Sequence, residues 1–183
     1  MLKKFFPSED IYNKSQAKSS VARGIRKNII EQYPEFEQYA DECFPKKDNL
    51  IIAKCNDDLQ FYIINKEPIF FSTKDGLYFP SLRVLQKYPT MMKRVQVDKG
   101  AIKFVISGAN IMCPGLTSPG GYLPEENIEA GEAVAIFAEG KVNPLAIGQL
   151  VLSTDDIKKV NKGIGINNIH YLNDGLWNTL EIE

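Results

Sequence analysis

The chain has 183 residues, of which 44% are hydrophobic and 25% are charged, and its formal net charge is −1. These values are typical of a globular protein with one large or two small domains, and they argue against wholesale wrapping of nucleic acid. No run of about 18 apolar residues occurs, so we expect no membrane-spanning helix. Cys43, Cys55 and Cys113 lack CxxC spacing, which indicates free thiols in the reducing cytoplasm rather than disulfides or a zinc site.

Charge is unevenly distributed along the chain. Residues 1–90 carry a net charge of +2, residues 91–183 carry −3, and the first thirty residues alone carry +5. Because the local field steers RNA and each phosphate contact needs a cation or donor, the acidic second half is a weak candidate for binding RNA alone. We expect any RNA-docking surface to be composite.

The first half of the chain mixes helix and strand patterns, which predicts an α+β domain. A helix is expected over residues 15–31, with Val21, Ile25 and Ile29 on one stripe. Gly24 inside this helix costs about 1 kcal/mol relative to alanine, which indicates a packing reason for it. The other expected elements are a helix over 35–44 after Pro34, strands over 50–55, 59–64 and 68–72, and a helix over 80–87 that Pro89 ends.

The second half opens on the most informative segment, residues 97–116, where a helix, a strand and a turn follow one another closely. Lys99 and Lys103 are four residues apart and are expected on the outer side of this helix. The segment is expected to form a helix capped by Asp98 and ended by Gly108, a strand over 109–112 and a turn at Pro114–Gly115. Strands over 133–138 and 145–152 are expected next, followed by a helix that begins at Ser153, turns Ile157 and Val160 inward and stops at Gly163. A closing strand contains Ile169, His170 and Tyr171.

No arrangement of residues indicates catalysis. The single histidine, His170, lies in the expected closing strand, where a packed or hydrogen-bonded role is the better interpretation. A Ser-His-Asp triad or a zinc site would need this histidine, and nothing nearby has the required spacing. The sequence also contains no phosphate-binding P-loop. We therefore expect no enzyme, no metal site and no other cofactor.

The segment 97–116 resembles the start of a PUA domain, the small RNA-binding module of pseudouridine synthases and archaeosine transglycosylases. The matching positions are Asp98, Gly100, Ala101, Gly108, Ala109, Ile111, Pro114 and Gly115. Longer blocks resemble the malignant T-cell-amplified sequence family of translation factors; they are 107–119, 160–166 and 168–177, with Met1–Phe5 and Lys87–Pro89 in addition. The resemblance therefore spans essentially the whole chain.

This resemblance implies an N-terminal α+β domain over residues 1–91, followed by a PUA pseudo-barrel domain over residues 92–183. It further implies a non-catalytic translation factor that binds the 40S ribosomal subunit as a heterodimer with density-regulated protein. Members of the family promote post-termination release of tRNA and mRNA (ribosome recycling), reinitiation, and non-standard recruitment of initiator tRNA, so direct tRNA contact is a further expectation.

The family pattern also implies which residues contact RNA. Carried over by position, they are Lys99, Gly100, Lys103, Gly108, Ala109, Asn110, Ile169, His170 and Tyr171. Glycines there permit close approach of a backbone, and backbone N–H groups can contact phosphate oxygens. Recognition of shape or of single strands is expected rather than the reading of a duplex.

Several weaker interpretations remain open. Arg23, Arg26 and Lys27 are either a contact with ribosomal RNA or a solvated helix face. Ser118, which precedes a proline on an expected loop, is a candidate phosphosite whose added charge would repel nearby phosphate. Apolar residues of the first domain, such as Phe5 and Phe6, are candidates for the partner surface, whereas the Phe70–Phe71 pair is expected in the core.

Two other functions compete with translation. One is a free RNA-binding PUA adaptor in ribosome biogenesis. The other is an RNA-modification enzyme with an appended PUA module, but roughly ninety preceding residues are too few for the catalytic domain that such an enzyme needs. Sedimentation with mature 40S subunits or with nucleolar precursors separates the translation factor from the biogenesis adaptor.

Overall fold

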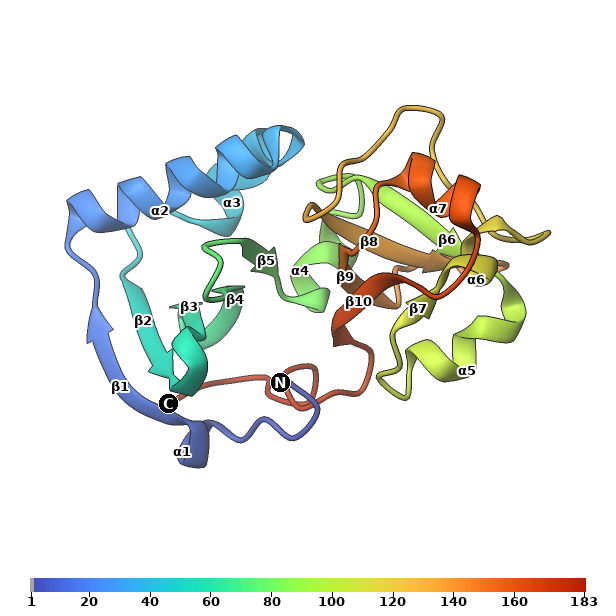
Figure 1. The fold of residues 1–183 in the computed structure, drawn as a ribbon. Helices are drawn as coiled ribbons and strands as arrows, with labels where there is room; N and C mark the ends of the chain where they lie inside the picture. Colours follow the sequence, from blue (N-terminus) through green and yellow to red (C-terminus); the bar gives the residue numbers. More distant parts are fainter. Residues whose placement is uncertain (1) are drawn as a thin grey trace.

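The computed structural model describes residues 2–183, which form two five-stranded sheets (Figure 1). The first sheet is antiparallel, and its strands follow one another in chain order. Its strands are β1 (Ile11–Gln16), β2 (Leu50–Cys55), β3 (Gln60–Ile64), β4 (Glu67–Ser72) and β5 (Tyr78–Pro80). Strands β2 and β3 pair antiparallel with Leu50 opposite Ile64, which confirms the predicted hairpin.

Helices cover one face of this sheet, where α2 and α3 lie over the strands (Figure 1). The helices of the first half are α1 (Pro7–Asp10), α2 (Ser19–Gln32), the 3₁₀ helix η1 (Pro34–Tyr39), α3 (Ala40–Cys43), the 3₁₀ turn η2 (Asn56–Asp58) and α4 (Leu82–Lys87). Ile25 and Ile29 of α2 and Phe36 of η1 are buried in the core beneath. The expected apolar stripe of α2 is thus confirmed at its two isoleucines.

The second sheet is mostly antiparallel and has the strand order β6-β8-β9-β10-β7. Its strands are β6 (Arg94–Val97), β7 (Ile111–Met112), β8 (Ala133–Ala138), β9 (Ala146–Leu150) and β10 (Ile164–Tyr171). Only β6 and β8 pair in parallel among the described strands. The accompanying helices are the 3₁₀ turn η3 (Lys99–Ala101), α5 (Ile102–Val105), α6 (Cys113–Thr117) and α7 (Thr154–Val160).

Strand β8 contributes to two hydrophobic cores at once. Ala133, Ala135 and Phe137 belong to the core of the first sheet, whereas Val134 and Ile136 belong to the core of the second. Successive side chains of a strand point to opposite faces, so an uninterrupted apolar run is what a strand buried on both sides requires. The two halves of the chain therefore share a packed interface along β8.

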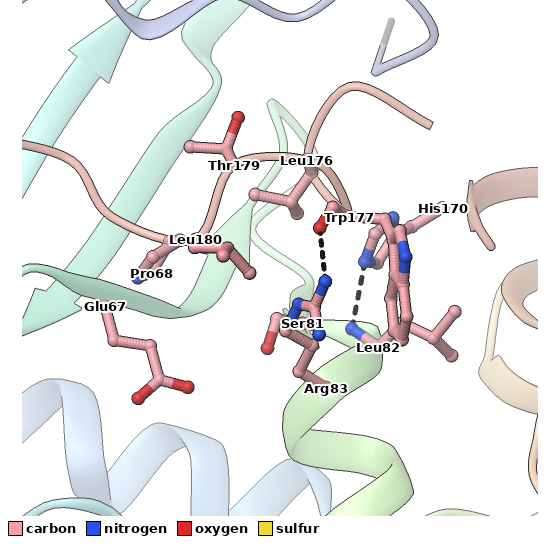
Figure 2. A pocket seen from close by; sticks show the side chains of 10 residues that line it. All are labelled: Glu67, Pro68, Ser81, Leu82, Arg83, His170, Leu176, Trp177, Thr179 and Leu180. Atoms are coloured by element: carbon pink, nitrogen blue, oxygen red, sulfur yellow. Dashed lines mark hydrogen bonds between the residues drawn. The ribbon is translucent and has the colours of Figure 1, made fainter. Parts of the chain in front are cut away.

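The segment after β10 returns to the first sheet. Leu176 and Ile182 are buried in the core of that sheet, and Ile182 N–H donates to Lys66 O at 2.7 Å. Arg83 of α4 holds the segment in place: its guanidinium lies 3.9 Å from the centre of the Trp177 ring and donates to Trp177 O at 2.9 Å (Figure 2). Residues 176–182, which the sequence analysis places in the second domain, thus pack on the first sheet.

The first half of the chain differs from expectation at its helices. The helix expected over 15–31 begins at Ser19, because residues 11–16 pair with β2 as an edge strand. Val21 is exposed rather than part of the buried stripe. The helix expected over 35–44 is divided into a 3₁₀ helix and a single α-helical turn.

The predicted packing reason for Gly24 is wrong, because a Cβ atom built at this position meets nothing within 4 Å. We therefore expect Gly24→Ala to raise the free energy of unfolding by up to about 1 kcal/mol, since alanine is the better helix former and restricts the unfolded chain. Urea denaturation with far-UV circular dichroism measures this change. A lower unfolding midpoint would contradict the expected gain.

The second half differs in its turns and caps. Pro114 and Gly115 lie inside the short helix α6 rather than in a tight turn, and the strand expected over 109–112 covers only its last two residues. Val160 is exposed, and Asn161, with φ of 45°, ends α7 before Gly163 is reached. Asparagine tolerates this left-handed backbone better than most residues, so it serves where a glycine was expected.

Candidate nucleic-acid interface

The helix that opens segment 97–116 is capped by Asp98, as expected; this helix and the turn that follows it, residues 98–110, are called the corner below. The Asp98 carboxylate accepts a hydrogen bond from Ala101 N–H at 2.9 Å, which satisfies a donor at the helix start. A second carboxylate, Glu139, accepts from Lys99 N–H at 2.9 Å. Because two acidic side chains already occupy these backbone donors, neither N–H is available to a phosphate, contrary to expectation. Any RNA contact at this end must come from side chains or from Gly100.

Lys99 and Lys103 supply the free positive charge of the corner. Both side chains are exposed, and neither forms an ion pair with another residue in the range 2–183. The ammonium group of Lys103 lies 5.1 Å from the centre of the Phe104 ring, which is itself 56% exposed. The corner thus presents two unpaired cations and an exposed aromatic ring to solvent.

Gly108 is required at the corner for two reasons. Its φ of 92° lies in the left-handed region that favours glycine, and a Cβ atom at this position would lie 2.7 Å from the Tyr171 hydroxyl. The ring of Tyr171 fills the space beneath the corner and is buried. Burial, with a smaller effect of the Asp174 carboxylate, raises the pKa of Tyr171. Tyr171 therefore supports the corner from within.

Asn168 of β10 fastens the corner to the sheet, a role that the sequence analysis missed. Its side-chain amide donates to Val105 O and to Ala109 O, each at 3.1 Å, and its backbone N–H donates to Asn110 Oδ1 at 3.0 Å. The two consecutive asparagines, Asn167 and Asn168, within a strand were the available signal. The hydrogen bonds fix residues 109 and 110 beside the last strand.

His170 is a packed histidine, as interpreted from the sequence. Its side chain is 1% exposed, and Nε2 accepts from Leu82 N–H at 2.9 Å (Figure 2). Nδ1 lies 2.6 Å from Asp174 Oδ2. Since a backbone N–H points at Nε2, the ring proton belongs on Nδ1, where Asp174 accepts it. His170 connects β10 to the start of α4 and lies away from the surface, so it is unavailable for the expected RNA contact.

The structure thus divides the predicted RNA-contacting residues into three groups. The exposed members are Lys99, Gly100, Lys103, Ala109 and Asn110; the half-buried members are Gly108 and Ile169; the buried members are His170 and Tyr171. The helix and the glycine corner lie together at one edge of the second sheet, beside β7 and β10 (Figure 1). The accessible part of the site is therefore the helix face and the corner, supported by the last strand.

The basic residues of α2 have different surroundings. Arg26 donates to Phe44 O at 3.2 Å and pairs with Asp41, whose pKa this hydrogen bond and charge hold below its usual range. Lys27 lies 3.9 Å from Glu31, and Arg23 is exposed without an ion pair within residues 2–183. Arg26 therefore has a structural role in holding residues 41–44 to α2. Of the three basic residues, only Arg23 has a side chain without an ion pair among the described residues.

Ser118 lies half-buried beside the helix start. Its hydroxyl donates to Asp98 Oδ2, the carboxylate that caps the helix. A phosphate at this position would replace an attractive contact by repulsion between like charges. The modification itself stays a prediction.

Metal-binding clusters, membrane-spanning helices and the state of the cysteines can each be judged for the described part of the chain. Residues 2–183 contain no group of three or more His, Cys, Asp or Glu side chains arranged to hold a metal ion. None of their helices is both long and apolar enough to cross a membrane. All three cysteines are free, and burial raises the pKa of Cys55 to about 11 and that of Cys43 to about 12.

Comparison with known proteins places this arrangement in a family. Residues 5–89 match the sequence model of a Pre-PUA-like domain, and residues 93–172 match that of a PUA domain. The chain is 52% identical over 177 residues to malignant T-cell-amplified sequence 1-B of Xenopus laevis, with 97% of each chain covered. It belongs to the malignant T-cell-amplified sequence family. The expected α+β fold with a C-terminal PUA domain is thereby confirmed.

A further relative is similar to this chain in sequence, and two solved structures are similar to it in fold. Translation machinery-associated protein 20 of Eremothecium gossypii is 49% identical over 179 residues and covers 97% of this chain and 98% of its own. A hypothetical protein from Pyrococcus horikoshii has a crystal structure that superposes with a TM-score of 0.72 at 26% identity, covering 91% of this chain and 98% of that one. A conserved PUA domain protein from Thermoplasma acidophilum, 19% identical, shares the fold with a TM-score of 0.66 over 92% of this chain and 99% of its own.

Proposed function

We propose that this family member is a non-catalytic, cytoplasmic translation factor that binds the 40S ribosomal subunit as a heterodimer with density-regulated protein. In this role it promotes post-termination release of tRNA and mRNA, reinitiation and non-standard recruitment of initiator tRNA. A relative of 49% identity is named for its association with the translation machinery, which supports the assignment. The observation that carries the proposal is the unpaired Lys99 and Lys103 pair beside the Gly108 corner of the PUA domain.

In the proposed RNA-contacting surface, the side chains of Lys99 and Lys103 supply positive charge, and the backbone around Gly108 supplies a shape that RNA can approach closely. It comprises Lys99, Gly100, Lys103, Gly108, Ala109, Asn110 and Ile169. Asp98 and Glu139 lie close to it and reduce the local positive field. A second contact through Arg23 of α2 supplies charge that the PUA domain lacks, so the complete interface spans both halves of the chain.

The combined substitution of Lys99→Glu and Lys103→Glu is expected to weaken 40S binding about 10- to 100-fold at low salt. Each lysine that contacts a phosphate releases counterions on binding, so both the affinity and its salt dependence should fall. Binding of fluorescently labelled protein to purified 40S subunits, measured at two salt concentrations, tests this result. Circular dichroism verifies that the domain stays folded.

A matched control uses Lys54→Glu with Lys74→Glu, which changes the charge equally at two exposed lysines of the first half. This variant should bind nearly as well as the wild type. Unchanged affinity of the Lys99 and Lys103 variant in both salt regimes would remove these two residues from the interface.

A further inference from the structure

Strand β1 lies at the edge of the first sheet. It pairs with β2 on one side, and no other described segment pairs with its outer side (Figure 1). Five of its six residues are exposed, including Tyr12 at 67%. Edge strands usually carry devices that prevent pairing with another chain, such as a proline, a cover, a bulge or a lysine. Strand β1 has no proline and no paired cover; it has one lysine, Lys14, and its bulge lies at the start of the strand, between Ile11 and Asn13, so residues 14–16 keep a regular register with β2.

The backbone of β1 has free hydrogen-bonding groups at defined positions. Ala17 N–H donates to Leu50 O at 2.8 Å, so residue 17 points its backbone groups toward β2. Backbone direction alternates along an antiparallel pair, and therefore Ser15 also points inward while Lys14 and Gln16 point outward. These outward groups are those that an added strand would use.

A hollow flanks the end of β1 on the face covered by α2. Its volume is about 330 Å³, and its wall includes Ala22 and Arg23 of α2, Phe44, Lys46 and Leu50. The contact of Arg26 with Phe44 O fixes the loop that forms the far wall. Apolar side chains, three basic residues (Arg23, Arg26 and Lys46) and one acidic residue, Asp48, line this hollow, so the charge of its lining is net positive.

A second hollow flanks β1 on the opposite face. Its volume is about 310 Å³, and it is lined by Gln16, Ile51, Ile63, Lys66 and Ile182, among others. Ile51 faces Ile63 across the β2–β3 pair, one position away from the Leu50 and Ile64 pair of the first hollow. Neighbouring positions on a strand point to opposite faces, so the two hollows lie on the two sides of the same edge.

We propose that the outer edge of β1 accepts an extended segment of a protein partner as a sixth strand, which places alternate side chains into the two hollows. Main-chain hydrogen bonds supply affinity in this mode, and the hollows supply specificity. Lys14, Lys18, Arg23 and Lys46 form no ion pair within residues 2–183, so the segment carries carboxylates and an apolar residue for the hollow beneath α2. This inference depends on the proposed function in one respect: it requires that the chain has a protein partner.

Lys14→Pro tests the proposal with the full-length chain and purified density-regulated protein as the probe. Proline removes an outward N–H and leaves the bonds to β2 intact, so the fold is retained. We expect the dissociation constant to rise about tenfold or more, because the added strand loses a main-chain hydrogen bond and its close approach. In the wild type, hydrogen–deuterium exchange should show new amide protection at Lys14 and Gln16 when the probe is present.

Lys14→Ala is the matched control, because it removes the same charge and keeps the N–H; its affinity should stay within about threefold of wild type. Wild-type affinity in a folded Lys14→Pro variant, or protection confined to other segments, overturns the edge-strand inference and leaves the heterodimer standing. Absence of any binding by the wild type overturns both. If a second copy of the chain, or 40S subunits alone, protects the β1 amides from exchange, the edge belongs to that occupant. This result also overturns the inference that a protein partner adds a strand there.

Discussion

Asp174→Ala is expected to lower the free energy of unfolding by about 4 kcal/mol. The Asp174 carboxylate is fully buried and accepts hydrogen bonds from His170 Nδ1 at 2.6 Å, Tyr171 N–H at 3.0 Å and Trp177 N–H at 2.8 Å. Alanine leaves all three donors without an acceptor; those of His170 and Tyr171 are buried and that of Trp177 is part-buried. Each buried donor costs about 1–3 kcal/mol if it stays unsatisfied. Urea denaturation followed by tryptophan fluorescence measures the loss, and Trp177 is a convenient probe because it lies beside the change.

Asp155→Ala is the matched control, since Asp155 is exposed in the first turn of α7. Its loss should not exceed about 0.5–1 kcal/mol, the usual size of a charge effect at a helix start. A similar small loss for Asp174→Ala would show that the network around His170 contributes little to the connection between the two halves.

Gly175→Ala should destabilise the protein by about 3 kcal/mol. A Cβ atom at Gly175 would lie 2.7 Å from Leu2 O and 2.8 Å from Phe5 O, and it would also meet Phe5 N. These are backbone atoms, which cannot rotate away as a side chain can. The substitution also threatens the hydrogen bond from Gly175 N–H to Leu2 O, which is 2.8 Å long. Thermal unfolding and faster amide exchange in residues 2–6 would report the change.

The same substitution at Gly24 serves as its control, because nothing there opposes a Cβ atom. The two alanine variants should therefore shift stability in opposite directions. A neutral Gly175→Ala would mean that the N-terminal segment can move away from residue 175 at little cost.

Much of the fold could be predicted from local sequence patterns. The apolar runs at 50–55 and 133–138 became β2 and β8 with the expected bounds, and the capping residues Asp98 and Ser153 start their helices as expected. These signals are local, because a strand or a cap is specified by a few neighbouring residues. Strand β1 was missed since its exposed residues carry no apolar alternation, and only pairing with β2 makes it a strand.

The candidate site was predictable in position but not in its internal contacts. The pattern at Lys99, Lys103 and Gly108 placed the corner correctly, with both lysines exposed. Glu139 lies in a hairpin that is distant in sequence, and it accepts a hydrogen bond from Lys99 N–H at the start of the same helix. No local sequence pattern indicates this contact. Asn168 likewise donates to Val105 O and Ala109 O, which are 63 and 59 residues away in sequence, and such contacts follow from the tertiary fold alone. The partners of Asp174 lie only three or four residues away, but its burial follows from the tertiary fold.

The return of residues 176–182 to the first sheet has a consequence for synthesis of the chain. Leu176 and Ile182 complete the core of strands that leave the ribosome about 100 to 170 residues earlier. Until those late residues emerge, the nascent sheet keeps an apolar face uncovered, and β1 offers it an open edge. Newly made chains are therefore most exposed to chaperones and to mispairing during this interval, and maturation of the N-terminal half is completed last.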